Sequence, residues 1–212
     1  MNYKQIKEYF ENYQRYILSS NDYTISSVLI PLVEIDDELH IVFQVRSSTL
    51  NTQPNEVSFP GGKMEIGETP LDTVIRETFE EFGLEKDKID ITTELDLFVS
   101  PFGVIIHSFL GKISSIDDIK FNTDEVESIF TVPLSFLVNY TPEEHVNSLI
   151  PNFDKNFPFD LIPDGKKYKF RNAKYKTYFY RYKNKVIWGM TAMILENFIN
   201  KLRQCQSFLK MS

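Results

Sequence analysis

The sequence predicts an α/β/α sandwich with a mixed β-sheet, in which helices cover both faces of one sheet. Three observations predict this class. Five segments rich in β-branched and aromatic residues are typical of strands, a helix with its own start and stop signals interrupts them, and a long amphipathic helix follows near the C-terminal end. The 212 residues, 42% of them hydrophobic, suffice for one buried core, so we expect a single domain over residues 1–212.

The chain begins with an expected N-terminal helix in residues 1–20. Apolar and aromatic residues recur at helical spacing over residues 3–18: Ile6, Phe10, Tyr13 and Ile17. This stripe favours a helix that packs on the core over a membrane anchor. The N-terminus lacks the apolar run of a secretion signal, no apolar run is long enough to span a bilayer, and the single cysteine, Cys205, excludes a disulfide within the chain. We therefore expect a cytoplasmic protein with no membrane partner.

Composition and periodicity place the strands and the remaining helices. Strands are expected at Ser26–Val33, Leu39–Val45, Glu94–Pro101, Val104–Ile113 and Ser128–Pro133. The first two are expected to pair around the acidic turn Glu34–Glu38. Further helices are expected at Pro133–Asn139, at Pro142–Leu149 and at residues 188–208, which form the C-terminal helix. Residues 150–166, rich in proline and aspartate, are typical of a surface excursion.

The interrupting helix carries its own boundaries. Thr69 suits the N-cap, where Asp72 completes a capping box with it, and Pro70 suits the first helical position. Gly83 can close the C-terminal end. Between these limits, residues recur at helical spacing and form the expected core-facing stripe: Leu71, Ile75, Thr78 and Phe82.

Three glutamates lie away from this stripe. Glu77, Glu80 and Glu81 fall on one ridge, about 130° round from the stripe, and we expect this ridge to face out of the core. Like charges at this spacing cost about 0.2–0.5 kcal/mol per pair, and acids in the last turn oppose the helix dipole. A divalent cation such as Mg²⁺, which prefers oxygen ligands and is often shared with phosphates, would compensate. The alternative is a solvated helix face, the ordinary role of isolated glutamates.

The spacing around these glutamates resembles the Nudix box. The matching residues are Gly62, Glu68, Arg76, Glu77, Glu80, Glu81, Gly83 and Leu84. Thr78 departs from the pattern, which has an apolar residue there, and we expect its hydroxyl to bond back to the preceding turn. The resemblance implies that water attacks a phosphorus of a nucleoside diphosphate linked to another moiety. The general base stays open between a box glutamate and Glu125, for which a loop-capping role is the alternative.

The resemblance also assigns roles within the box. It implies Mg²⁺ or Mn²⁺ as the cofactor, with Glu77 and Glu81 as the first metal ligands and Glu80 next. It implies an ion pair between Arg76 and Glu68 that orients the helix and the preceding loop. These five residues are therefore the predicted catalytic set.

Directly upstream, Val45–Gly62 contains an Arg-Ser pair, a loop and the ending Val-Ser-Phe-Pro-Gly-Gly. This block is similar to an additional motif of Nudix enzymes that act on coenzyme A. Asn55 replaces a glycine of that motif, and asparagine tolerates left-handed backbone angles. Ile187–Ala192, at the start of the last helix, is a third match to this subgroup. The substrate-binding residues that the resemblance implies here are Arg46, Ser47, Ser58, Phe59, Gly61 and Gly62.

Positive charge is concentrated within an expected excursion and hairpin over residues 141–186. Gly165–Val186 holds nine Lys or Arg and no acid, which leaves 14 basic against 30 acidic residues in the rest of the chain. Basic and aromatic residues alternate in Lys167–Arg171 and in Tyr178–Lys183, which suggests a hairpin.

We expect this basic arm to hold the 3′-phosphate of coenzyme A and to stack on adenine. The residues are Lys169, Arg171, Lys176 and Arg181, with Tyr168 or Tyr178 for stacking. The alternatives are a solvated hairpin and single-stranded nucleic-acid binding.

Together these patterns predict a Nudix hydrolase that cleaves the diphosphate of coenzyme A or an acyl derivative. The products would be adenosine 3′,5′-bisphosphate and phosphopantetheine or its acyl form. The alternatives are the same chemistry on ADP-ribose, NADH or an oxidised nucleotide, or a Nudix-like module that binds a nucleotide or RNA without cleaving it. We expect a small-molecule partner and no nucleic acid. A homodimer stays open.

Overall fold

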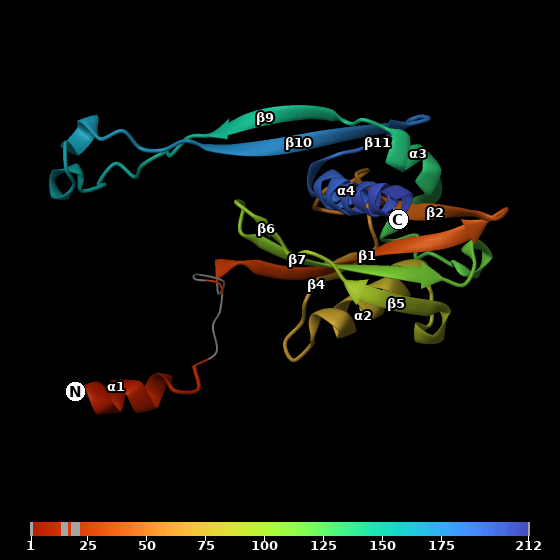
Figure 1. The fold of residues 1–212 in the computed structure, drawn as a ribbon, viewed down its shortest axis with the longest axis horizontal. Coiled ribbons are helices and arrows are strands. Elements are labelled where there is room, and N and C mark those ends of the chain that lie inside the picture. Colours follow the sequence, from red (N-terminus) through yellow and green to blue (C-terminus); the bar gives the residue numbers. More distant parts are fainter. Residues whose placement is uncertain (1, 14–16, 18–21, 212) are drawn as a thin grey trace.

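The computed structural model describes residues 2–13, 17 and 22–211, and of residues 206–211 it describes the backbone alone. Its centre is a mixed β-sheet with helix α2 (Pro70–Phe82) on one face and helix α4 (Gly189–Met211) on the other (Figure 1). The strands of this sheet are β1 (Thr24–Ile35), β2 (Glu38–Arg46), β3 (Val57–Ser58), β4 (Gly61–Lys63), β5 (Ile89–Glu94), β6 (Phe98–Ser100), β7 (Val104–Ile113) and β8 (Val126–Pro133). The predicted α/β/α sandwich is confirmed.

Strand β1 organises the sheet. It pairs with β7 in parallel and with β2 and β4 antiparallel, so the sheet is mixed. The strand order is β3-β2-β1-β7-β5, with β4 on β1, β6 on β7 and β8 on β2. Asp36 and Asp37 form the predicted turn between β1 and β2, both with positive φ. This topology brings the end of β2, the start of β3 and the short β4 together beside α2.

Alternation along the strands separates the two layers. Leu29 of β1 packs in a cluster with Val74 and Phe82 of α2, whereas the next residue, Ile30, packs in the cluster that contains Leu195 of α4. Both faces of the sheet are therefore buried. This burial explains the nearly continuous apolar runs of β1 and β2.

A second, three-stranded sheet in the order β11-β10-β9 extends from the body (Figure 1). Its strands are β9 (Glu143–Leu149), β10 (Ala173–Tyr182) and β11 (Lys185–Ile187). The predicted helix at Pro142–Leu149 is therefore wrong. Almost every residue of β9 is exposed, so its sequence carries no apolar alternation, and its strand character depends on pairing with β10.

The predicted hairpin between Lys167–Arg171 and Tyr178–Lys183 is also wrong. Alternation of period two correctly marks the second segment, which lies mostly in β10, but β10 pairs with β9 and β11. Residues 165–167 form a short 3₁₀ turn instead of a strand. Residues 150–172 make the excursion between β9 and β10, at the end of the arm that points away from α2 (Figure 1).

Three further segments differ from the prediction in part. The single strand expected at Glu94–Pro101 is two strands, β5 and β6, since β5 ends at Glu94 and both pair with β7. The short helix predicted after β8 is α3 (Leu134–Asn139). The C-terminal helix begins one residue later than predicted and runs to Met211.

No helix in the described part of the chain is long and apolar enough to cross a membrane.

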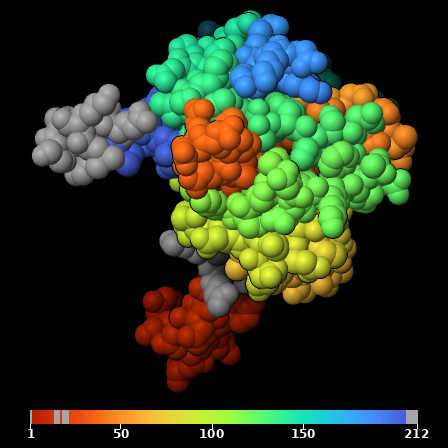
Figure 2. Space-filling model, turned by 90° about the vertical axis from the view of Figure 1, so that its right-hand side faces the viewer, coloured from red at the N-terminus to blue at the C-terminus, as the bar shows by residue number. Residues whose placement is uncertain are grey.

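The N-terminal helix α1 (Tyr3–Phe10) is shorter than predicted and does not pack on the core. None of its residues is buried, and the predicted stripe is 41% to 61% exposed at Ile6, Phe10, Tyr13 and Ile17. Figures 1 and 2 both show α1 standing apart from the sheet. Periodicity predicted the amphipathic helix but gave no information on what its apolar face contacts. Of the residues 1–20 in which this helix was predicted, residues 1, 14–16 and 18–20 lie outside the described residues.

Candidate active site

Helix α2 begins and ends where its local signals predicted. The Thr69 hydroxyl accepts from the Asp72 N–H at 3.2 Å, and the Asp72 carboxylate accepts from the Thr69 N–H at 3.1 Å, which completes the capping box. Gly83 closes the helix with φ of 65°, in the left-handed region that favours glycine. The Thr78 hydroxyl donates to the carbonyl of Val74 at 2.6 Å, as expected.

The buried face of α2 is rotated from the predicted stripe. Leu71 is 42% exposed, whereas Thr73 and Val74 are fully buried together with Phe82. The prediction that Glu81 lies on an outward ridge is wrong, because its side chain is buried with 1% exposure. A helical wheel allows for one packing surface, but β4 lies against a second side of this helix, where Gly61 contacts Glu81 and Lys63 contacts Arg76.

Glu81 is held from two directions. One carboxylate oxygen accepts from the side-chain amide of Gln44 at 2.8 Å, and the other accepts from the backbone N–H of Gly61 at 2.8 Å. The guanidinium of Arg46 lies 3.9 Å away. The carboxylate is therefore fixed by β2 and by the start of β4, in one orientation.

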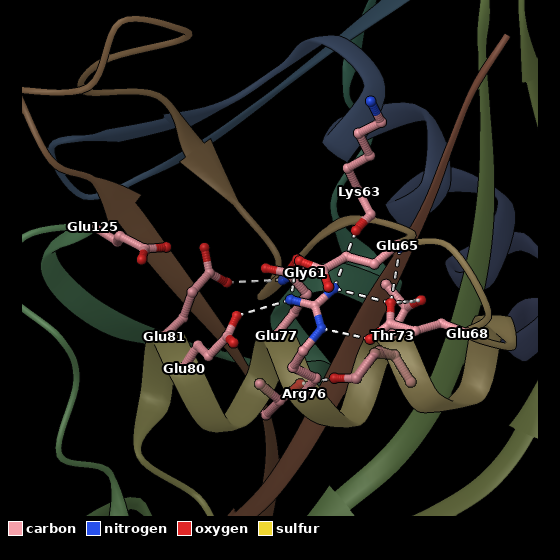
Figure 3. Close-up of polar contacts among 12 residues, drawn as sticks. Gly61, Lys63, Glu65, Glu68, Thr73, Arg76, Glu77, Glu80, Glu81 and Glu125 are labelled. Carbon is pink, nitrogen blue, oxygen red and sulfur yellow. Dashed lines mark hydrogen bonds and ion pairs between the residues drawn. The ribbon is translucent and has the colours of Figure 1, made fainter.

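Arg76 forms ion pairs with the other glutamates of the predicted catalytic set (Figure 3). Its guanidinium donates to Glu68 at 2.6 Å and 3.1 Å, to Glu77 at 2.9 Å and to Glu80 at 2.8 Å. It also donates to the carbonyl of Lys63 in β4 at 3.1 Å. The ion pair with Glu68 is thus present, and Arg76 joins α2 to both the preceding loop and β4.

Burial and charge set the proton affinities of these acids. Burial, followed by repulsion from Glu77, raises the pKa of Glu81 to about 7, although hydrogen bonds from Gln44 and Gly61 oppose the rise. Burial likewise raises the pKa of Glu77. In contrast, the Arg76 guanidinium lowers the pKa of Glu68 to about 2. Two acids of α2 are therefore costly to ionise together, and this cost favours a cation beside them.

The raised pKa of Glu81 predicts a particular pH dependence of stability. Between about pH 4.5 and 7 the folded state binds more protons at Glu81 than the unfolded state, so stability falls as the pH rises through this window. We expect wild type to lose up to about 3 kcal/mol there in the presence of a chelator. Glu81→Gln removes the titrating group and should flatten this slope. Urea unfolding across this pH range measures both proteins, and parallel slopes would contradict the assignment.

The two glycines that begin β4, Gly61 and Gly62, bring backbone close to the glutamates. A Cβ on Gly62 would lie 2.5 Å from the Glu77 carboxylate, and a Cβ on Gly61 would lie 2.2 Å from the backbone oxygen of Ser27. Gly61 has φ of 147°, which a side chain disfavours. The two glycines therefore make room for Glu77 on one side and β1 on the other.

The upstream block supplies one wall of the site. Arg46 faces Glu81, and the buried Ser47 hydroxyl contacts Thr49 at 2.9 Å. Asn55 has φ of 62°, in the left-handed region as expected from its substitution for glycine. Phe59 is buried at 2% exposure and stacks on Phe43, so the structure places it in the core rather than on an accessible surface.

Sequence reasoning missed Gln44. Its side chain is fully buried, donates to both Glu81 and the hydroxyl of Ser58, and has an amide oxygen without a hydrogen-bond partner. The available signal was a polar residue inside the apolar run of Ile41–Val45. A buried amide in such a run requires a polar partner, and here the partner is Glu81.

Glu125 lies at the edge of the same cluster (Figure 3). Its carbonyl accepts from the Ser47 N–H at 2.8 Å, which ties its loop to the upstream block. Its negative charge contributes to the raised pKa of Glu77. The capping role and the chemical role considered for Glu125 are thus compatible with its position.

The donors suit a hard divalent cation, although they are not arranged around one. No three carboxylate, imidazole or thiolate groups among the described residues converge on a single point. Arg76 accounts for part of this, because it holds Glu77 and Glu80. The closely spaced carboxylates and the raised pKa of Glu77 and Glu81 fit a cation that would neutralise them. The set that would hold it is Glu77, Glu80 and Glu81.

The structure does not bring the basic arm to this cluster. Lys169 and Arg171 lie in the excursion at the end of the arm (Figure 1). Lys176 and Arg181 pair with Glu144 and Glu143 of β9 at 2.9 Å and 2.8 Å. Two of the predicted cations are therefore already partnered, and the other two are remote from α2.

The fold and the cluster together define a carboxylate-rich site whose oxygen donors are of the kind that hard divalent cations prefer. A family model described as the NUDIX domain matches residues 24–152. The chain therefore belongs to the NUDIX domain family. Members of this family generally use divalent metal ions.

Individual relatives are similar over part of their length. The chain is 32% identical over 149 residues to Nudix hydrolase 3 of Caenorhabditis elegans, which covers 66% of this chain and 62% of the relative. It is 32% identical over 141 residues to a peroxisomal coenzyme A diphosphatase of Mus musculus, covering 66% and 58%. A C. elegans protein also named peroxisomal coenzyme A diphosphatase is 38% identical over 132 residues, covering 60% and 56%. The chain thus spans less than two thirds of each of these relatives.

Among solved structures, the chain is similar to an Ap4A hydrolase of C. elegans. The match has a TM-score of 0.45 and 18% identity, and it covers 54% of this chain and 83% of the other.

Proposed function

We propose that the protein is a divalent-metal-dependent hydrolase that cleaves the diphosphate linkage of coenzyme A or acyl-coenzyme A. Water adds to one phosphorus and the bridging phosphorus–oxygen bond breaks. The products are adenosine 3′,5′-bisphosphate and phosphopantetheine or its acyl form. Two relatives named coenzyme A diphosphatases support this substrate class.

The observation that carries the proposal is the contact between the upstream block and the glutamate helix. Gly61 and Arg46 both belong to the block, and both face the buried carboxylate of Glu81. A residue set that resembles a coenzyme A motif therefore forms a wall of the acid cluster, where the diphosphate would bind. The resemblance and the geometry converge on one site.

In the proposed mechanism the chain positions groups and controls charge. The bound Mg²⁺ or Mn²⁺ supplies charge neutralisation and activation of water. Glu77 and Glu81 are the proposed ligands, with Glu80 next, and Gln44 and Gly61 fix the orientation of Glu81. An acid not committed to the cation is the proposed proton acceptor, either a box glutamate or Glu125.

Arg76 has a positioning role in this proposal. Its contacts with Glu68 and Lys63 anchor the loop and β4, while its contacts with Glu77 and Glu80 restrain the ligands before a cation arrives. Since guanidinium presents several donors in a fixed plane, lysine would not replace it. The positive charge of Arg76 also offsets part of the repulsion between Glu77 and its acidic neighbours.

The substrate assignment predicts a preference between two diphosphates. We expect kcat/KM for coenzyme A to exceed that for ADP-ribose by at least tenfold, or about 1.4 kcal/mol of differential transition-state binding. The reason is that the block from Arg46 to Gly62 contributes contacts specific to coenzyme A. Initial rates with Mg²⁺ on both substrates measure the ratio. Equal values would refute the subgroup while leaving diphosphate hydrolysis intact.

Two finer assignments stay proposals. The binding of the 3′-phosphate by Lys169 and Arg171 gains no support from their position, and KM for coenzyme A against its dephospho form, in charge-removing variants, tests it. The cytoplasm is the proposed compartment, whereas two relatives carry the word peroxisomal in their names. Microscopy of the tagged protein distinguishes the two compartments.

A further inference from the structure

A pocket of about 680 Å³ lies beside the upstream block. Its apolar wall consists of Val45, Val57, Phe179, Val186 and Trp188. Val45 and Val57 belong to the core cluster on the α4 side of the sheet, whereas Gln44 and Arg46, on either side of Val45 in β2, face Glu81. The pocket and the acid cluster therefore lie on opposite faces of the same end of β2.

The pocket is suited to an uncharged, apolar group. Trp188 and Phe179 stack with ring centroids 6.1 Å apart and planes 6° apart, and Trp188 remains 42% exposed. Covering exposed apolar surface of this kind with an apolar ligand is favourable, because it removes that surface from water. Glu56 and Glu127 also line the pocket, against one cation, Lys185. This balance of charge disfavours a phosphate there.

The loop between the two sites is tied to the strand they share. The N–H of Asn55 donates to the carbonyl of Arg46 at 3.1 Å, and the carbonyl of Glu56 accepts from the N–H of Arg46 at 2.9 Å. Asn55 and Glu56 line the pocket, and Arg46 faces Glu81. This loop therefore borders the pocket and is bonded directly to Arg46, the residue that faces the acid cluster.

We propose that this pocket binds the acyl chain of acyl-coenzyme A and that Trp188 is its main specificity-determining residue. The proposal rests on the proposed function for the location of the diphosphate. It also gives a role to the segment Ile187–Ala192, which contains Trp188 and resembles the coenzyme A subgroup in sequence. Free coenzyme A has no acyl group to place in the pocket.

Trp188 is the only tryptophan of the chain, so its fluorescence reports on the pocket without catalysis. We expect decanoyl-coenzyme A to shift the emission of the Glu81→Gln protein in a saturable manner, and coenzyme A alone to leave it unchanged. An unchanged emission with decanoyl-coenzyme A, or the same shift with both ligands, would overturn the proposal. The same shift with both would place the nucleotide in the pocket instead.

Kinetics of variants give a second, independent reading. Trp188→Ala should lower kcat/KM for decanoyl-coenzyme A at least tenfold, mainly through KM, and change that for coenzyme A less than twofold. Val186→Trp should act in the same direction by filling the pocket, even if Trp188→Ala folds poorly. Phe102→Ala, which removes a 62% exposed aromatic side chain outside the pocket, is the control and should leave kcat/KM for both substrates unchanged. Equal losses of kcat/KM for both substrates in Trp188→Ala would overturn the acyl assignment.

The two proposals fail in different ways. If wild type hydrolyses neither ligand while the emission of Trp188 responds to decanoyl-coenzyme A alone, the hydrolase function is wrong and the pocket assignment stands. If both ligands are hydrolysed while the emission of Trp188 does not change with either, the function stands and the pocket assignment is wrong.

Discussion

Glu81→Gln is expected to lower kcat by at least about a thousandfold while the fold persists, and Glu77→Gln is expected to lower it by a comparable factor. Glutamine is nearly isosteric with glutamate but carries no charge, so it cannot serve as an anionic ligand. In Glu81→Gln the side-chain oxygen can still accept from Gln44 or from Gly61, which preserves part of the packing. Initial rates at saturating Mg²⁺ and circular dichroism measure activity and fold.

Glu85→Gln is the matched control for these variants. Glu85 is an exposed acid just beyond the same helix, and it makes no salt bridge in the described part of the chain. We expect it to retain the wild-type rate. Near-normal turnover of both box variants would rule out this cluster as the metal site.

Gly61→Ala is expected to have the largest effect on stability. The new Cβ would meet the backbone oxygen of Ser27 at 2.2 Å, and the backbone at φ of 147° disfavours any side chain. Since β1 cannot move without disturbing the sheet, we expect a loss of about 3 kcal/mol or more in the free energy of unfolding. Activity should also fall, because the Gly61 N–H orients Glu81. Urea unfolding with a chelator measures the loss.

Gly62→Ala is the neighbouring comparison and should separate stability from activity. The three atoms nearest to its new Cβ all belong to the Glu77 carboxylate, the far end of a side chain that can rotate away. We expect a change in stability of less than about 1 kcal/mol and a fall in activity of tenfold or more, through displacement of Glu77. A stability loss equal to that of Gly61→Ala would show that the two glycines do not have the distinct roles described.

Local signals predicted local structure well in this protein. The caps of α2 at Thr69 and Gly83 and the bounds of β7 follow from residues within those elements. In contrast, β9 takes its strand character from β10, whose residues come more than twenty positions later, and its exposed residues carry no pattern of their own. The same limit applies to α1, whose periodicity predicted a helix but not what it contacts.

The candidate site shows the same division. Helical spacing grouped Glu77, Glu80 and Glu81, and the resemblance to the Nudix box implied the ion pair of Arg76 with Glu68, which is present. Spacing could not predict that Glu81 is buried, because Gly61 of β4 and Gln44 of β2 approach it from segments distant in the sequence. The ion pairs of Lys176 with Glu144 and of Arg181 with Glu143 could not be predicted for a similar reason, because the pairing of β9 with β10 brings these residues together.

The most direct test of the account is analysis of the products that purified protein forms from coenzyme A in the presence of Mg²⁺. Cleavage of the diphosphate predicts adenosine 3′,5′-bisphosphate and phosphopantetheine in equal amounts, with neither formed by Glu81→Gln or in excess chelator. If coenzyme A stays intact under conditions in which the protein is folded and binds Mg²⁺, or if the Glu81→Gln protein forms the same products at the same rate, the central claim is contradicted.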